Sequence, residues 1–154
     1  MGAIEERLAE LGIALPEPFA PVGNFVPAVV TSGGLVFVSG QGPTANGSVV
    51  FRGKVRSSVS VADGYQAARL CALNCLGTLQ AELGSLDRIE RIVKVLGMVN
   101  ADPDFTEHPT VVNGASDLLV EVLGDRGRHA RSAVGMSSLP MDITVEVELV
   151  AAMS

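Results

Sequence analysis

The stretch that decides the fold covers residues 131–150 and reads RSAVGMSSLPMDITVEVELV. On both sides of Pro140, apolar residues alternate with polar or small ones, a pattern typical of half-buried β-strands. The alternation predicts strands at residues 131–138 and 143–150. With a turn centred just after Pro140, we expect the two strands to pair as an antiparallel hairpin.

This predicted hairpin has two unlike faces. One face is apolar and belongs to the core: Val134, Met136, Ile143, Val145, Val147 and Leu149. The other is polar or small: Arg131, Ala133, Gly135, Ser137, Thr144, Glu146 and Glu148. The second face is either a solvated surface or a shallow ligand site, because small side chains beside an arginine leave room for a ligand.

Working outward, the rest of the chain alternates strand and helix signals. We expect strands at residues 28–31, 35–39 and 89–99, with a possible short one at 49–51. Helices are expected at residues 4–11, from the cap at Ser60 to Gly84, and from Pro109 to Gly124. This order predicts an α+β fold of two layers, a mixed β-sheet with two helices on one face.

Length and composition are those of one domain. The 154 residues form a single domain in which residues 1–20 are an N-terminal extension. Hydrophobic residues make up 47% of the chain and only six residues are aromatic, so the core is expected to be aliphatic. The open face of the sheet, if partly apolar, needs a partner.

The charge balance excludes several partners. A net charge of −6 argues against nucleic acid and against an anionic membrane surface. The sequence holds no apolar run long enough to span a bilayer and no signal for export, so we expect a cytoplasmic location. Cys71 and Cys75, four apart on a helix, are expected to be buried small hydrophobes and not metal ligands.

Five segments together resemble the Rid family, also called the YjgF or endoribonuclease L-PSP family. They read RHARSAVG at 128–135, LP at 139–140, VEVE at 145–148, NFVPAV at 24–29 and FVSGQGP at 37–43. The resemblance covers nearly the whole chain from about residue 21 onward. The C-terminal segments are specific, whereas the SGQ segment alone is a weak signal.

The resemblance implies a chorismate-mutase-like homotrimer with ligand clefts between subunits. It further implies hydrolysis of 2-imino or enamine acids, or related small carboxylate metabolites, with no metal and no cofactor. By motif, Arg131 matches the arginine that binds the substrate carboxylate and Glu146 the acid that activates water. Asn113 matches a cleft asparagine, and Ser39 matches the serine of the SGQ segment.

Two positions depart from the deaminase pattern and indicate a divergent branch. Phe25 stands where many members have tyrosine, and Ala133 where deaminases often have cysteine. Both departures leave a second function open, a non-catalytic trimer that binds small ligands. A third, endoribonuclease activity, is disfavoured by the acidic composition.

Simpler interpretations of single residues stay open at this point. Arg131 could be a surface cation that balances Glu146 or Glu148 across the sheet. His129, in a basic loop, is expected to be solvated and not catalytic. Ser39 has no histidine and aspartate placed by motif, which argues against a serine hydrolase.

Overall fold

The structure, a computed structural model, describes residues 1–154. Its helices are α1 (Ala3–Glu10), α2 (Val61–Leu83) and α3 (His108–Leu123), with short 3-10 helices η1 (Leu86–Arg88), η2 (Gly124–Gly127) and η3 (Pro140–Asp142). Its strands are β1 (Ala28–Val30), β2 (Leu35–Gln41), β3 (Thr44–Ala45), β4 (Ser48–Val49), β5 (Ile89–Asn100), β6 (Ala130–Met136) and β7 (Val145–Met153).

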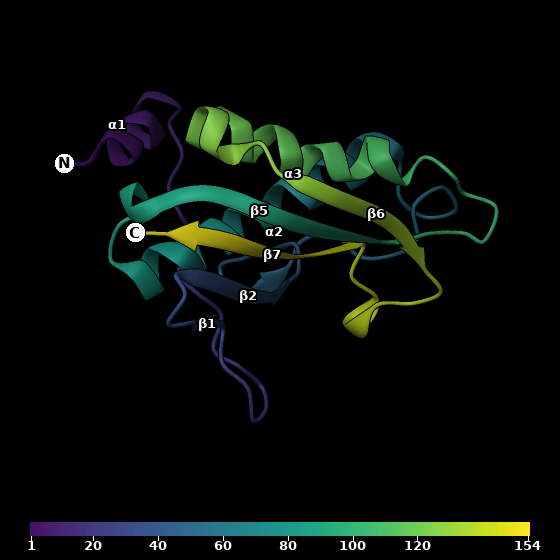
Figure 1. The fold of residues 1–154 in the computed structure, drawn as a ribbon. Coiled ribbons are helices and arrows are strands. Elements are labelled where there is room, and N and C mark those ends of the chain that lie inside the picture. Colours follow the sequence, from purple (N-terminus) through teal and green to yellow (C-terminus); the bar gives the residue numbers. More distant parts are fainter.

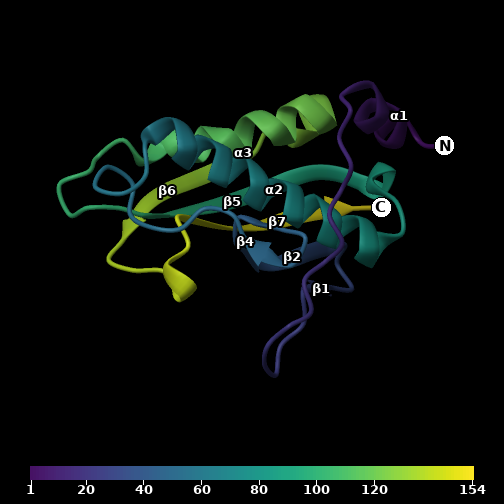
Figure 2. The same cartoon turned by 180° about the vertical axis from the view of Figure 1, so that it is seen from behind.

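Five of the strands form one mixed sheet in the order β1-β2-β7-β5-β6. Neighbouring strands are antiparallel except β5 and β6, which are parallel. Helices α2 and α3 lie side by side on one face of the sheet, and the other face carries no helix (Figures 1 and 2). The predicted α+β fold with two helices over a mixed sheet is therefore confirmed.

The two long helices begin and end where the sequence signals them. Ser60 caps α2 by accepting a hydrogen bond from the Asp63 backbone at 3.0 Å, and Gly84 ends it in the left-handed conformation at φ 79°. Pro109 occupies the first turn of α3, where its missing N–H costs nothing. The predicted strand at 49–51 is found at Ser48–Val49, but it pairs only with β3, outside the main sheet.

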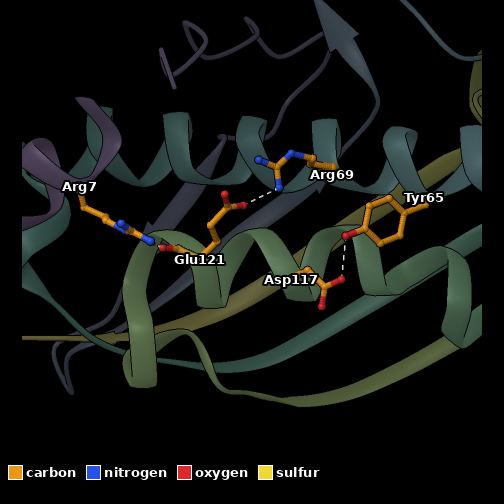
Figure 3. Close-up of polar contacts among 5 residues, drawn as sticks. All are labelled: Arg7, Tyr65, Arg69, Asp117 and Glu121. Atoms are coloured by element: carbon orange, nitrogen blue, oxygen red, sulfur yellow. Dashed lines mark hydrogen bonds and ion pairs between the residues drawn. The ribbon is translucent and has the colours of Figure 1, made fainter. Parts of the chain in front are cut away.

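Helix α1 packs onto the helical layer. The Arg7 Nε donates to the carbonyl of Glu121 at 3.1 Å, which fixes α1 against the end of α3. Two contacts then join α2 to α3: the Arg69 guanidinium pairs with Glu121 at 2.8 Å, and the Tyr65 hydroxyl donates to Asp117 at 2.7 Å (Figure 3). These polar contacts border the outer surface of the helix pair.

The core between helices and sheet is aliphatic, as predicted. The largest fully buried side chains are leucine, isoleucine and valine, and Phe105 is the one aromatic residue in the cluster. Cys71 and Cys75 are buried there, and their thiols face the carbonyls of β7. Burial raises the pKa of both thiols, which keeps them protonated and unreactive. None of the helices is long and apolar enough to cross a membrane.

The predicted C-terminal hairpin is wrong. Strands β6 and β7 both exist, but β5 lies between them and pairs with each. The segment that joins them, residues 137–144, passes over the end of β5 and does not form a tight turn. Strand alternation reveals which residues share a face of one strand, but it does not reveal which strand lies next to it.

Asn100, fully buried at the end of β5, holds this connection in place. Its amide donates to the Asp142 carboxylate at 3.0 Å and to the Ile143 carbonyl at 3.1 Å. The ammonium of Lys54 donates to the Asn100 amide oxygen at 2.8 Å. The connection is therefore attached to the strand that it crosses, and the local signal of a turn at Pro140 becomes the short helix η3.

The new register separates residues that were expected on one face. Val95 of β5, fully buried under the helices, pairs with Arg131 on one side and with Leu149 on the other. Met98 pairs with both Val134 and Glu146. Paired residues share a face, so Arg131 points to the helical side of the sheet and Glu146 to the open side.

The open face of the sheet is partly apolar. Phe37 and Val29 are paired on adjacent strands and remain 47% and 51% exposed, and Val134 at the other edge is 38% exposed. Val134 and Met136 were expected in the core. The side of β6 that faces α3 instead carries Arg131, Ala133 and Gly135.

Candidate functional site

One candidate site is a pocket of about 720 Å³ at the edge of the open face. The segment that precedes β1, the end of β2, the β3–β4 ribbon and η3 surround it. Of the residues predicted for the site, it contains Phe25, Ser39 and Glu146. Figure 1 shows the segment that precedes β1 extending away from the sheet.

A bulge in β2 shapes this pocket. The pairing of β2 with β7 loses its register between Val38 and Gln41, which leaves Ser39 and Gly40 out of the ladder. The Ser39 hydroxyl donates to the Val26 carbonyl at 2.7 Å, and its backbone N–H donates to Pro27 at 2.8 Å. Ser39 thus ties the segment that carries Phe25 to the strand.

Glu146 is the acid of the pocket. Its carboxylate lies directly against Gly40, where any side chain at position 40 would collide with it. Burial raises the pKa of Glu146, and the nearby Glu148 raises it further. The carboxylate accepts no hydrogen bond and makes no ion pair within the chain, so it is free to hold or take a proton.

Phe25 supplies an apolar wall. The residue is 56% exposed, and its ring brings no hydroxyl to the pocket. A tyrosine at this position would add a donor and acceptor to the pocket. The side chain therefore sets the shape of the pocket but not its hydrogen bonding.

Arg131 lies elsewhere, between β6 and α3. Its Nη1 donates to the Asn113 side chain at 2.8 Å and to the Ser116 hydroxyl at 3.1 Å. The two predicted residues Arg131 and Asn113 are thus in contact, and Ala133 follows on the same side of β6, partly buried against the core. No carboxylate of the chain pairs with Arg131, so the suggested balance with Glu146 or Glu148 is wrong.

His129 belongs to this second cluster, contrary to the expectation that it is solvated. It is half-buried, with Nδ1 2.6 Å from the Gly127 carbonyl and Nε2 2.9 Å from the Ser116 hydroxyl. The nitrogen that faces a carbonyl must donate, so Nε2 accepts from Ser116 in the neutral ring. Burial lowers the pKa of His129, and the charge of Arg131 lowers it further.

The cluster formed by Asn113, Ser116, His129 and Arg131 positions one guanidinium. Ser116 donates to His129 and accepts from Arg131, which restricts the arginine to one orientation. Ser116 was missed at the level of sequence. Its spacing of three from Asn113 on a helix would have placed both on the face that meets Arg131.

The predicted site residues therefore fall into two groups on opposite faces of the sheet. Phe25, Ser39 and Glu146 lie at the open-face pocket, whereas Arg131 and Asn113 lie at the outer edge of the helical layer. One copy of the chain does not bring the two groups together. A site that uses both needs a second copy.

Comparison with known proteins gives a consistent picture. A family model described as "YjgF/chorismate_mutase-like, putative endoribonuclease" matches residues 5–153. The protein TCP17 of Trypanosoma cruzi is 45% identical over 148 residues, which cover 96% of this chain and 92% of that protein.

Two solved structures are similar over almost their whole length. The protein Atu1372 from Agrobacterium tumefaciens, of unknown function, is 45% identical with a TM-score of 0.91, covering 98% of this chain and 92% of that one. A putative endoribonuclease from Shewanella oneidensis is 35% identical with a TM-score of 0.94, covering 99% and 100%.

Proposed function

Because the chain belongs to the Rid (YjgF, or endoribonuclease L-PSP) family, with its α+β chorismate-mutase-like fold, we propose that it hydrolyses 2-imino or enamine acids. The substrates are small reactive carboxylates, and the reaction needs no cofactor. The observation that carries the proposal is Glu146, a partly desolvated carboxylate without a partner in a pocket of its own.

The chemistry of hydrolysis requires one group that moves protons. Water adds to C2 of the imine while Glu146 takes a proton from it and passes that proton to the imine nitrogen. The C–N bond of the resulting carbinolamine then breaks, the hydroxyl proton moves to nitrogen, and ammonia leaves with a 2-oxo acid remaining. A pKa raised towards neutrality suits a carboxyl that must both accept and donate.

Arg131 supplies the carboxylate clamp from a second copy. Its guanidinium is already oriented by Asn113 and Ser116, and it retains N–H groups for a bidentate contact with a carboxylate. The exposed apolar face, which includes Phe37 and Val134, gives a second copy a surface to cover. We propose a homotrimer in which each cleft uses Glu146 of one subunit and Arg131 of another.

A second function is favoured by Phe25 and Ala133. Without the tyrosine hydroxyl and the cysteine thiol, the cleft holds two fewer polar groups, which suits a trimer that binds small carboxylates without converting them. Both functions use the same clamp, and they differ only in the role of Glu146.

The test is to add the purified protein to 2-imino acids generated freshly from amino acids by an amino acid oxidase. Trapping the imine with semicarbazide in parallel measures its lifetime. We expect the imine to disappear faster and the 2-oxo acid to appear faster than in buffer. Unchanged imine lifetimes, together with measurable carboxylate binding, would contradict the hydrolase and support a trimer that binds small carboxylates without converting them.

A further inference from the structure

One charged residue of the pocket has no part in the mechanism above. Arg52 and Glu146 are the only charged residues that line it. They do not pair with each other, since no ion pair of the chain includes either. The pocket therefore presents a free cation on one part of its wall and a free acid on another.

The position of Arg52 is fixed by its backbone. Arg52 forms an isolated antiparallel bridge with Ile143. The flanking backbone adds two hydrogen bonds, from Gly53 N–H to the Asp142 carbonyl at 2.8 Å and from Thr144 N–H to the Phe51 carbonyl at 3.2 Å. The segment is thus attached to the same connection that passes over β5 and leads to Glu146.

The side chain of Arg52 remains available to a ligand. One terminal nitrogen donates to the Met141 carbonyl, which orients the guanidinium and leaves its charge unpaired. By contrast, the nearby Arg56 is held by Asp104 at 2.7 Å. A guanidinium offers five N–H donors in a planar fork that matches a carboxylate.

Resting on the proposed function, we propose that Arg52 binds a second carboxylate of the substrate, so that the preferred substrates are 2-imino or enamine dicarboxylates. Arg131 of another subunit takes the carboxylate beside the imine, and Arg52 takes the distal one. Two guanidiniums offset the two charges of such a substrate, which would otherwise be repelled by Glu146 and by a chain of net charge −6.

The pocket also has room for the longer ligand. At about 720 Å³ it is large for a three-carbon imino acid, and Val22, Phe25 and Ile143 give it apolar walls for the methylene groups of a dicarboxylate. Its only charged contacts remain at Arg52 and Glu146.

Calorimetry on the purified oligomer tests this inference without relying on turnover. Succinate, glutarate and adipate are compared with butyrate for the wild type, Arg52→Gln, Arg52→Lys and the control Arg56→Gln. We expect the best dicarboxylate to bind about tenfold or more tightly than butyrate, as a charged hydrogen-bonded contact predicts. Arg52→Gln should abolish that preference, whereas Arg52→Lys should keep part of it and Arg56→Gln all of it.

A wild type without the preference, or an Arg52→Gln variant that keeps it, overturns the inference. Turnover separates this failure from failure of the hydrolase. Equal hydrolysis of mono- and dicarboxylate imines would contradict the role of Arg52 and support the enzyme. A preference for dicarboxylates that depends on Arg52, with no hydrolysis of any imine, would support the role of Arg52 and contradict the enzyme.

Discussion

At the scale of the residue, the proposed chemistry depends on Glu146 and on the lack of hydrogen-bond donors around its carboxylate. Its carboxylate rests against Gly40 with no donor from the chain, while Arg131 on the opposite face is oriented by Asn113 and Ser116. A free acid and a fixed cation are what a hydrolase needs for proton transfer and for positioning a carboxylate.

The first prediction concerns the rate. Glu146→Gln keeps the shape of the pocket but removes the base, so turnover of 2-imino acids should fall at least about tenfold, because general-base steps usually contribute about a hundredfold or more. Glu90→Gln is the control, since Glu90 is exposed on β5 and does not line the pocket. Equal turnover in Glu146→Gln and the wild type would rule out the assignment of the base.

The second prediction concerns stability and pH. Burial raises the pKa of Glu146 above its usual 4.5, so between 4.5 and the raised value the folded chain binds more protons than the unfolded one. Stability from this group is complete below pH 4.5 and is lost as the pH rises through the raised value. Glu146→Gln should therefore raise Tm relative to the wild type more at pH 7 than at pH 4. An equal difference in Tm between Glu146→Gln and the wild type at pH 4 and pH 7 would contradict the raised pKa of Glu146.

At the scale of the element, the bulge of β2 determines where the acid lies. Ser39 and Gly40 leave the ladder, Ser39 holds the segment with Phe25, and Gly40 makes space for the carboxylate. The bulge of β2 thus builds the pocket, because it brings strand β7 and the segment that carries Phe25 together.

The third prediction tests that bulge. In Gly40→Ala the added Cβ would collide with the Glu146 carboxylate, so the acid must move and turnover should fall at least about tenfold while the fold persists. Gly33→Ala is the control, because a Cβ there meets only the Thr31 hydroxyl at 3.9 Å. Full activity in Gly40→Ala would show that the position of the carboxylate does not matter for the rate.

The same scale explains what could be predicted from the sequence. The helices follow from local signals such as the Ser60 cap and Gly84, and the β1–β2 hairpin follows from the glycines of its turn. The placement of β5 between β6 and β7 involves contacts between distant segments, such as those of Asn100 with a loop some forty residues later, which no local pattern encodes. The prediction that Arg131 lies on the same face of the sheet as Glu146 was wrong for that reason.

The candidate site divides in the same way. The motifs single out Phe25, Ser39 and Glu146, which line one pocket, and Arg131 and Asn113, which contact each other elsewhere. Arg52 was missed because it lies between elements and reaches the pocket only through its bridge to Ile143. His129 was misjudged because its burial depends on a helix that precedes it in the chain.

At the scale of the whole molecule, the sheet has a helical face and an open face. The open face carries exposed apolar residues such as Phe37 and Val29, and the two halves of the site lie on different faces. Association of copies would cover the exposed apolar residues and bring the two halves of the site together.

The fourth prediction is therefore the oligomeric state. Light scattering coupled to size exclusion should give the mass of three chains of 15.9 kDa at micromolar concentration. Phe37→Lys, which places a charge on the open face, should shift the population towards monomer, because burying an unpaired charge in an interface is costly. A stable monomer of the wild type would contradict a site shared between subunits.

The central claim, imine hydrolysis at a cleft that joins Glu146 of one subunit to Arg131 of another, is tested most directly by mixing two impaired variants. Glu146→Gln and Arg131→Gln are unfolded together, refolded as a mixture and assayed on 2-imino acids. Random assembly leaves both wild-type residues in some clefts, so about a quarter of wild-type turnover should return, above the residual turnover of either variant alone. A mixture as inactive as its components, with mixed trimers demonstrated, would contradict the shared site.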